Sequence, residues 1–189
     1  MTTVYFVRHA EPDLSNHNDL TRDLTPKGIE DRKFLIDYFK NKKLDVAFSS
    51  PFRRAIRTIE PVAKSRNLKI NQISEFCERK IDDEWISNFH EYCQKQWFDF
   101  DYKLENGESL NDVQKRNINA LKNLLTDYPD KSIIIGSHGT AIGTIINYFD
   151  SSFEYPAFSK IQPIMPFVAK FNFSGDKVDY QIIAFNSKN

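Results

Sequence analysis

The sequence predicts an α/β protein, a three-layer α/β/α sandwich around a mostly parallel central sheet. Short runs of β-branched and aromatic residues alternate with longer segments in which apolar residues recur at helical spacing. The strongest strand pattern, 132–136, is apolar through Ile133, Ile134 and Ile135, as expected of a central strand buried on both faces. Strands that alternate with helices in this way favour a parallel sheet covered on both sides.

Length and composition indicate one domain that spans residues 1–189. A chain of 189 residues with 40% hydrophobic content can bury one core but is short for two full domains. Acidic and basic residues number 26 each, so the charge balance gives no electrostatic reason to expect nucleic-acid or membrane-surface binding. No basic leader precedes an apolar run, and none of the apolar runs is long enough to span a membrane.

The cysteine content indicates a reducing compartment. Cys77 and Cys93 lack the spacing of metal ligands, so we expect two reduced thiols in a cytoplasmic protein. The expected assembly is a monomer or a homodimer.

The first part of the chain predicts strands at 4–7, 44–48 and 69–73 and a polar loop at 11–23. Thr25 as N-cap and Pro26 at the first helical position open a helix that ends near Asn41. Four apolar residues form the expected stripe of this helix: Ile29, Leu35, Ile36 and Phe39.

A second helix is predicted after Ser49-Ser50-Pro51, which repeats the arrangement of a capping residue followed by proline. Pro61 is expected to kink this helix or to begin a new turn, because proline lacks a backbone N–H. Four apolar positions at helical spacing are expected to face the sheet: Phe52, Ile56, Ile59 and Ala63.

Residues 82–106 form an unusual acidic and aromatic segment, which we interpret as an insertion that is mostly helical with a looser end. Its aromatic side chains have two interpretations. The first, which we favour, is a small core for an added helical layer. The second is a cap over the functional site whose aromatic residues select the ligand. The aromatic residues run from Trp85 to Tyr102.

The last part of the chain predicts a long helix, a central strand, a second helix and a hairpin. Ser109 and Asp112 make a capping box for a helix that continues to about Asp127. The strand 132–136 leads into a helix at 141–149, and the proline-containing segment 151–166 is expected to be loop-rich. A terminal hairpin, 167–173 with 178–185, is expected to turn at Gly175-Asp176.

Cationic and imidazole side chains follow three of the predicted strands. Arg8 and His9 end the first strand, Arg53 and Arg54 follow the second, and His138 follows the strand 132–136. Because the carboxyl ends of parallel strands line the ligand crevice of an open α/β sheet, we expect these side chains to converge. Basic residues in the first turn of a helix oppose its dipole, which is expected where an anion binds.

These residues belong to a set of patterns that resembles the histidine phosphatase superfamily, also called the phosphoglycerate mutase-like family. Ala10 replaces the commoner glycine and Pro12 stands where threonine is frequent, so the loop after His9 is expected to differ in shape. Six patterns occur in the order of the family: Arg8-His9-Ala10-Glu11, Leu24-Thr25-Pro26-Lys27-Gly28, Ser49-Ser50-Pro51-Phe52-Arg53-Arg54-Ala55-Ile56-Arg57-Thr58, Phe76-Cys77-Glu78-Arg79, Gly107-Glu108-Ser109 and Ser137-His138-Gly139.

The resemblance implies transfer of a phosphoryl group, whose peripheral oxygens must be positioned and neutralised. Arg8 and Arg54 are the expected phosphate clamp, because planar guanidinium groups donate paired hydrogen bonds to phosphate. Arg53 is the less favoured alternative, since the arginine of the family directly precedes the alanine.

His9 is the expected nucleophile, which accepts the phosphoryl group on nitrogen and passes it to water. It must be neutral to attack, and the neighbouring arginines should lower its pKa below about 6.5. His138 is the expected second histidine, which donates to a phosphate oxygen.

By resemblance the proton donor to the leaving oxygen is Glu78, and a nearby phosphate dianion should favour its protonated form. Spacing alone does not select it over Glu75, Asp82, Asp83 or Glu84. Further expected substrate-binding residues are Ser15 or Asn16, together with Gly139 and Thr140. Arg79 has two interpretations, a contact to a second anionic group of the substrate or a plain surface charge.

The expected function is a metal-independent phosphatase that hydrolyses a phosphomonoester through a phosphohistidine on His9. No cofactor or metal is expected, because His17 and His90 lack ligand spacing and the arginines take the part of magnesium. The expected partner is a small phosphorylated metabolite, with no nucleic acid and no membrane. Two alternatives stay open: a phosphoglycerate mutase-type transfer and a degenerate module that only binds phospho-ligands.

Overall fold

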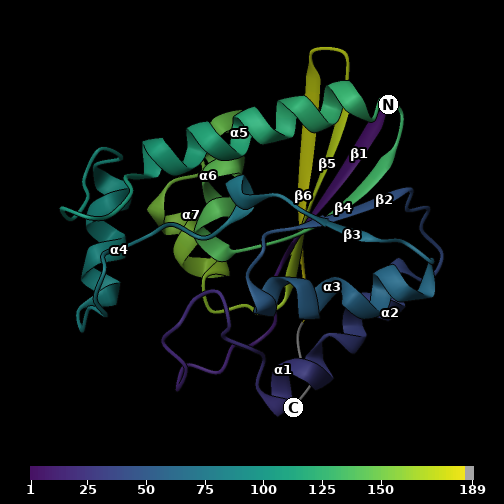
Figure 1. The fold of residues 1–189 in the computed structure, drawn as a ribbon. Helices are drawn as coiled ribbons and strands as arrows, with labels where there is room; N and C mark the ends of the chain where they lie inside the picture. Colours follow the sequence, from purple (N-terminus) through teal and green to yellow (C-terminus); the bar gives the residue numbers. More distant parts are fainter. Residues whose placement is uncertain (186–189) are drawn as a thin grey trace.

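In the computed structural model, which describes residues 1–185, six strands form one sheet in the order β3-β2-β4-β1-β5-β6 (Figure 1). Four strands run parallel: β1 (Thr2–Arg8), β2 (Val46–Ser49), β3 (Ile70–Gln72) and β4 (Ser132–Ser137). β5 (Phe167–Ser174) is antiparallel to β1, and β6 (Lys177–Ala184) is antiparallel to β5. The predicted α/β sandwich with a mostly parallel sheet is confirmed.

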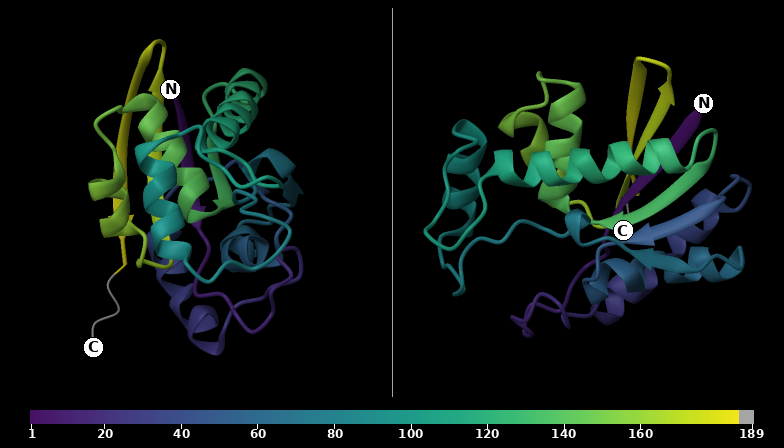
Figure 2. Two further views of the ribbon diagram at one scale, coloured as in Figure 1. Left: turned by 90° about the vertical axis from the view of Figure 1, so that its left-hand side faces the viewer. Right: turned by 45° about the horizontal axis from the view of Figure 1, so that its top comes forward.

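Helices cover both faces of this sheet (Figures 1 and 2). One face carries α1 (Pro26–Asp31), α2 (Lys33–Phe39) and α3 (Arg53–Ser65). The other carries η1 (Ser74–Phe76), α5 (Leu110–Asp127) and α6 (Gly139–Phe149). α4 (Phe89–Phe98) and α7 (Tyr155–Ile161) pack against each other beside this second layer. No helix in residues 1–185 has the length and apolar character needed to cross a bilayer.

The two layers arise from alternation along β1. Val4 and Phe6 point into the core shared with α5, α6 and α7, whereas Tyr5 and Val7 point into the core shared with α2 and α3. Ile133 and Ile135 of β4 join the first core, and Ile134 joins the second. An all-apolar strand is therefore required at the centre, where both faces are buried.

The helix predicted from residue 26 to about 41 is divided at Arg32. The predicted N-cap is confirmed, because the Thr25 hydroxyl accepts a hydrogen bond from the Gly28 amide at 3.0 Å. Leu35 and Phe39 of the predicted stripe are buried. Ile29 and Ile36 are exposed, and the prediction of a single stripe was wrong for these two.

α3 begins at Arg53, and its N-cap is Phe52, not one of the predicted serines. The Ser50 hydroxyl is instead bonded to His138 at 2.7 Å. The buried face of α3 is displaced from the predicted one. Phe52 and Ile56 are only half-buried, and the face consists of Arg54, Ala55, Thr58, Ile59, Val62 and Ala63.

Pro61 lies inside α3 without starting a new helix. Because proline has no N–H, the carbonyl of Arg57 loses its helical partner. The Arg32 guanidinium donates to that carbonyl at 2.7 Å. A side chain from the division between α1 and α2 thus replaces the missing backbone bond.

Segment 82–106 is less helical than predicted, because α4 covers only Phe89–Phe98. The chain after α4 is held in turns, where the Gln96 amide donates to the carbonyls of Tyr102 and Glu108. The prediction that 151–166 is loop-rich missed α7, in which Pro156 occupies the first turn and Phe158 is buried.

The capping box and the terminal hairpin are confirmed. Ser109 and Asp112 exchange hydrogen bonds at the start of α5. The hairpin turns at Gly175, whose φ of 58° lies in the left-handed region that glycine adopts without strain.

Candidate active site

Three neighbouring strands end side by side and bring the predicted residues together. β4 lies between β1 and β2, so segments near residues 8, 50 and 138 become neighbours at one edge of the sheet (Figure 1). Main-chain bonds continue just past the strands, from His9 N–H to the Ser137 carbonyl at 3.1 Å and from Ser50 N–H to the Gly136 carbonyl at 2.9 Å. The rings of His9 and His138 lie with their centroids 5.2 Å apart.

His9 is buried and oriented by its own loop. Its Nδ1 lies 2.8 Å from the Ala10 carbonyl, which only accepts, so the ring proton lies on Nδ1 and Nε2 keeps its lone pair. The Ala10 amide in turn donates to the Thr58 hydroxyl at 2.9 Å. Burial, followed by the charges of Arg54 and Arg8, holds the pKa of His9 well below its usual 6.5. The imidazole is therefore neutral at neutral pH.

His138 is fully buried, and its Nε2 lies 2.7 Å from the Ser50 hydroxyl. That hydroxyl accepts from the Phe52 amide, so its own hydrogen is free to point at Nε2. The ring proton then lies on Nδ1, which has no hydrogen-bond partner among residues 1–185. Burial and the charge of Arg54 hold the pKa of His138 well below 6.5. The Nδ1–H of His138 is therefore a buried hydrogen-bond donor without an acceptor in the described residues.

Arg8 is held by the loop that follows α7. Its Nη1 donates to the carbonyls of Ile161, Gln162 and Ile164. Its Nε is buried and has no partner among the described residues. A Cβ on Gly139 would lie 3.0 Å from this Nε, so glycine allows the guanidinium to approach the start of α6. Burial lowers the pKa of Arg8 to about 10, which leaves it charged at neutral pH.

Arg54 and not Arg53 lies in the site. The Arg54 side chain is 3% exposed, whereas Arg53 is 56% exposed and pairs with Asp23 at 2.8 Å. Asp19 holds Arg54 twice, through its carbonyl at 2.9 Å and its carboxylate at 3.0 Å. Burial lowers the pKa of Arg54, and the Asp19 charge opposes this effect.

Glu78 bridges the segment after η1 and the start of α6. Its carboxylate accepts from the Thr140 amide at 3.0 Å and from the Arg79 amide at 2.9 Å. Its charge also raises the pKa of both Arg8 and Arg54, which places Glu78 within electrostatic reach of the clamp. Of the other carboxyl groups that spacing left open, Asp82 accepts from the Asn106 amide at 3.2 Å and Asp83 pairs with Lys80. Glu75 and Glu84 have no hydrogen bond to the start of α6 among the described residues.

Arg79 is buried, so the interpretation as a plain surface charge was wrong. Its guanidinium donates to the Thr140 hydroxyl and to Cys93 Sγ and lies over the rings of Phe89 and Tyr92. None of these partners is a carboxylate, and Nε has no partner among the described residues. A buried cation without a counter-charge is costly, which is expected where a ligand supplies the anion.

Ser15 and Asn16 make contacts within their own loop. The Ser15 hydroxyl donates to Asp13 at 2.7 Å, and the Asn16 amide donates to the Thr21 hydroxyl at 3.2 Å. Neither side chain is hydrogen-bonded to His9, His138 or the two clamp arginines, so the substrate role of Ser15 or Asn16 stays a prediction.

Sequence reasoning did not single out Asp19 or Arg22, which border the site, and it considered Trp85 only as part of the aromatic segment 82–106. Arg22 is buried, pairs with Asp19 at 2.9 Å and contributes to the low pKa of His9. Trp85 stacks on His17 with centroids 4.3 Å apart and lies under the Arg22 guanidinium. A polar loop without periodicity offers no pattern that distinguishes these residues from solvated ones.

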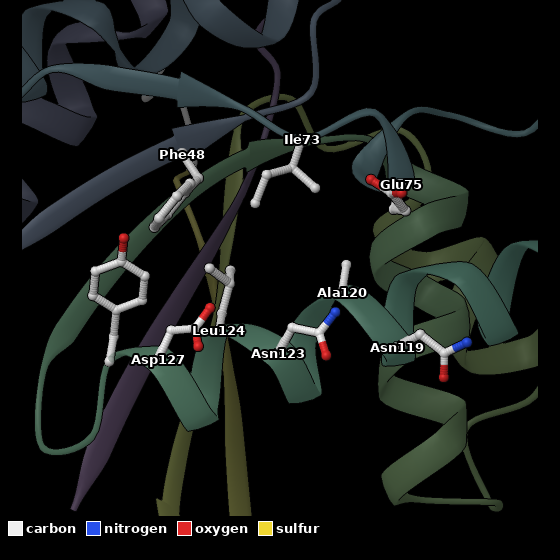
Figure 3. A pocket seen from close by; sticks show the side chains of 9 residues that line it. Phe48, Ile73, Glu75, Asn119, Ala120, Asn123, Leu124 and Asp127 are labelled. Carbon is white, nitrogen blue, oxygen red and sulfur yellow. The ribbon is translucent and has the colours of Figure 1, made fainter.

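A surface hollow of about 330 Å³ lies between α5 and the β2–β3 edge (Figure 3). Phe48, Ile73, Glu75 and Leu124 are among its lining residues. None of the histidines or clamp arginines lines it, so it is distinct from the strand-end site. Within residues 1–185, no group of three or more His, Cys, Asp and Glu side chains is placed to hold a metal ion.

An α/β sandwich with two neutral imidazoles and buried guanidiniums at its strand ends defines an enzyme of phosphoryl chemistry. Residues 4–179 match the histidine phosphatase superfamily, branch 1. The chain belongs to this superfamily and is a histidine phosphatase.

Relatives with assigned names agree with this membership. The chain is 29% identical over 152 residues to an uncharacterized phosphatase, PhoE, of Bacillus subtilis, covering 77% of this chain and 76% of the relative. It is 26% identical over 154 residues to phosphoserine phosphatase 1 of Hydrogenobacter thermophilus, covering 73% and 71%. The fold matches phosphoserine phosphatase of Entamoeba histolytica in complex with 3-phosphoglyceric acid, with a TM-score of 0.81, 22% identity and coverage of 99% and 98%.

Proposed function

We propose that this protein hydrolyses small phosphomonoesters without a metal, through a phosphohistidine on His9 and with Glu78 as the proton donor. The observation that carries the proposal is the state of His9. Its Nδ1–H is bonded to the Ala10 carbonyl, and its pKa is well below 6.5, so Nε2 has a free lone pair at neutral pH. A buried neutral imidazole beside buried arginines suits attack on a phosphorus atom.

In the first step, His9 Nε2 attacks phosphorus, the P–N bond forms and the P–O ester bond breaks. Glu78, in its carboxylic acid form, gives its proton to the leaving oxygen. Developing charge on the peripheral oxygens is met by Arg8, Arg54 and His138. Arg8 Nε and His138 Nδ1 are buried donors without a partner in the described residues, and a phosphoryl group would supply the acceptors.

In the second step, water attacks the phosphohistidine. Glu78, now a carboxylate, accepts a proton from the water as the P–N bond breaks. Inorganic phosphate is formed, and His9 returns to its neutral form. The hydrogen bonds that hold Glu78 to the backbone of Arg79 and Thr140 keep the carboxyl group at the start of α6 throughout.

The inferred substrates carry a carboxylate as well as a phosphate. Arg79 supports this, since it is a buried guanidinium whose side-chain partners are a hydroxyl, a thiol and two aromatic rings. A carboxylate would provide the missing counter-charge. Relatives named phosphoserine phosphatase agree with this class, so phosphoserine is the first compound to assay.

Rapid quench of the protein with labelled phosphoserine into alkaline denaturant tests the nucleophile. We expect a protein-bound label that is labile in acid, stable in base and absent from the His9→Ala variant. His90→Ala is the matched control, because His90 is exposed on α4 and should retain the label. Full turnover by His9→Ala, or a label that persists in it, would show that His9 is not the nucleophile.

A further inference from the structure

Asp19 occupies donors of the phosphate clamp. Its Oδ1 lies 3.0 Å from Arg54 Nη2 and 2.9 Å from Arg22 Nη1. Its carbonyl also accepts from Arg54 Nη1 at 2.9 Å. One residue of the 11–23 loop therefore engages both terminal nitrogens of the arginine that we assign to the substrate phosphate.

The Asp19 carboxylate lies at the solvent boundary while its partners are buried. The Asp19 side chain is 54% exposed, compared with 7% for Arg22 and 3% for Arg54. A rotation about the side-chain bonds would move the carboxylate into water. The two guanidinium groups are held in place by further bonds. Arg22 also donates to the carbonyls of Asn16 and His17, and Arg54 donates to the carbonyl of Asp19.

The loop backbone has its own anchors and does not depend on this carboxylate. The Leu20 carbonyl accepts from the Arg53 amide at 3.0 Å, at the start of α3. The Asn18 side chain accepts from the amides of Leu20 and Thr21. Release of the Asp19 carboxylate therefore requires a change of one side chain and no opening of the loop.

We propose that Asp19 is an internal competitor for the clamp, a carboxylate that every incoming anion must displace from Arg54 and Arg22. The proposal rests on the proposed function, in which Arg54 binds the substrate phosphate. A carboxylate oxygen and a phosphate oxygen accept the same hydrogen bonds from guanidinium. Without Asp19, Arg54 Nη2 and Arg22 Nη1 would retain any small anion. The built-in carboxylate weakens the binding of every anion, so only strong ligands stay bound.

The test compares Asp19→Asn with the wild type. Displacement of the Asp19 carboxylate has the same free-energy cost for every anion. Removing the carboxylate should therefore lower the dissociation constants of all anions by one common factor, about 10-fold if that cost is about 1.4 kcal/mol. The dissociation constant of inorganic phosphate is measured by calorimetry, and acetate is measured as its competitor. We expect equal factors for the two anions and a lower KM for phosphoserine.

Asp23→Asn is the matched control. Asp23 lies on the same loop and pairs with Arg53 at 2.8 Å and Arg57 at 3.4 Å, away from Arg54. This variant should leave phosphate and acetate affinities unchanged, although it removes the same charge from the loop. Asp19→Ser removes the carboxylate without adding an amide. Its affinities for phosphate and acetate should rise as they do in Asp19→Asn, and its thermal unfolding shows whether the fold is kept.

The outcomes separate the inference from the function on which it rests. Phosphate binding that is unchanged or weaker in Asp19→Asn would overturn the competitor and show that Asp19 orients Arg54. A larger gain for phosphate than for acetate would also overturn it, because repulsion at a distance scales with the charge of the anion and displacement does not. Failure of the wild type to bind phosphate at all would overturn the proposed function itself.

Discussion

The strand-end part of the site and the loop part are built differently. His9, His138, Arg8 and Arg54 are each at most 9% exposed. Main-chain bonds between β1, β2 and β4 fix the strand ends that carry Arg8, His9 and His138, and the helix α3 carries Arg54. The loop part consists of Asp19, Arg22 and Trp85, which contact one another through side chains and are also held by arginine side chains that donate to loop carbonyls. We therefore expect the strand-end part to be rigid and the loop part to adjust its side chains when an anion binds.

Removal of Arg54 is expected to give the largest effect on the strand-end part. Arg54→Ala removes a buried cation from the developing phosphoryl charge, so kcat/KM should fall about 100- to 1,000-fold. Steady-state kinetics with phosphoserine measures the change. Arg53→Ala is the control, because this neighbour is 56% exposed and pairs with Asp23. Equal losses in the two variants would contradict the assignment of the clamp.

Glycines of α6 distinguish the site from the core behind it. Gly139→Ala would place a Cβ 3.0 Å from Arg8 Nε and displace the guanidinium, so kcat/KM should fall about 10- to 100-fold. Gly143→Ala would place a Cβ 2.9 Å from Phe158, which should cost about 1–3 kcal/mol of unfolding free energy and spare catalysis. Kinetics and urea unfolding of both variants measure the two effects. A loss of kcat/KM in Gly143→Ala but not in Gly139→Ala would contradict the assignment of Gly139 to the site and of Gly143 to the core.

Acid should weaken the fold through the same two histidines that serve the chemistry. Burial holds the pKa of His9 and of His138 well below 6.5, whereas in the unfolded chain each titrates near 6.5. The unfolded state therefore takes up more protons as the pH falls. The free energy of unfolding should decrease by up to about 1.4 kcal/mol per pH unit for each histidine below pH 6.5.

Urea unfolding between about pH 6.5 and pH 5 measures this slope, and His138→Gln should flatten it by removing one of the two groups. The acid limb of kcat/KM should also lie below pH 6.5, since His9 stays neutral until its lowered pKa is reached. An acid limb at or above 6.5 would show that His9 is not held neutral by its surroundings.

Trp85 is expected to give the smallest effect, and only on the loop part. Trp85→Ala removes the stack on His17 and the contact with Arg22, so the KM for phosphoserine should rise about 2- to 5-fold with kcat retained. Trp85 is 57% exposed, so thermal stability should change little. Phe98→Ala is the control, because Phe98 is 74% exposed on α4 and should leave KM unchanged. A fall in kcat would place Trp85 in the chemical step.

The sheet and the strand-end residues were predictable because their signals are local. Apolar runs such as Ile133-Ile134-Ile135 mark buried strands, and polar residues directly after them fall at the edge where parallel strands end. The choice of Arg54 over Arg53 came from the family resemblance, in which the arginine directly precedes the alanine, and Arg54 is the buried one of the two. The strands and the polar residues that directly follow them can be found from neighbouring residues in the sequence alone, without knowledge of the tertiary contacts.

The loop part was not predictable, because its contacts join segments that share no pattern. Arg22 is buried among Asp19, Trp85 and two carbonyls, and the sequence gives no sign that the polar loop 11–23 and the aromatic segment 82–106 meet at this point. α7 was missed because Pro156 and Pro163 resemble loop markers, although proline is accepted in a first turn. Burial of Phe158 and Ile161 stabilises that short helix.

The place of β4 has a consequence for synthesis on the ribosome. β1 and β2 do not pair with each other; each pairs with β4, which begins at Ser132. A nascent chain that has not yet reached this strand lacks the ladder that sets His9 beside Arg54. Termination or pausing before that point would leave a product with no assembled centre, however well its first helices had formed.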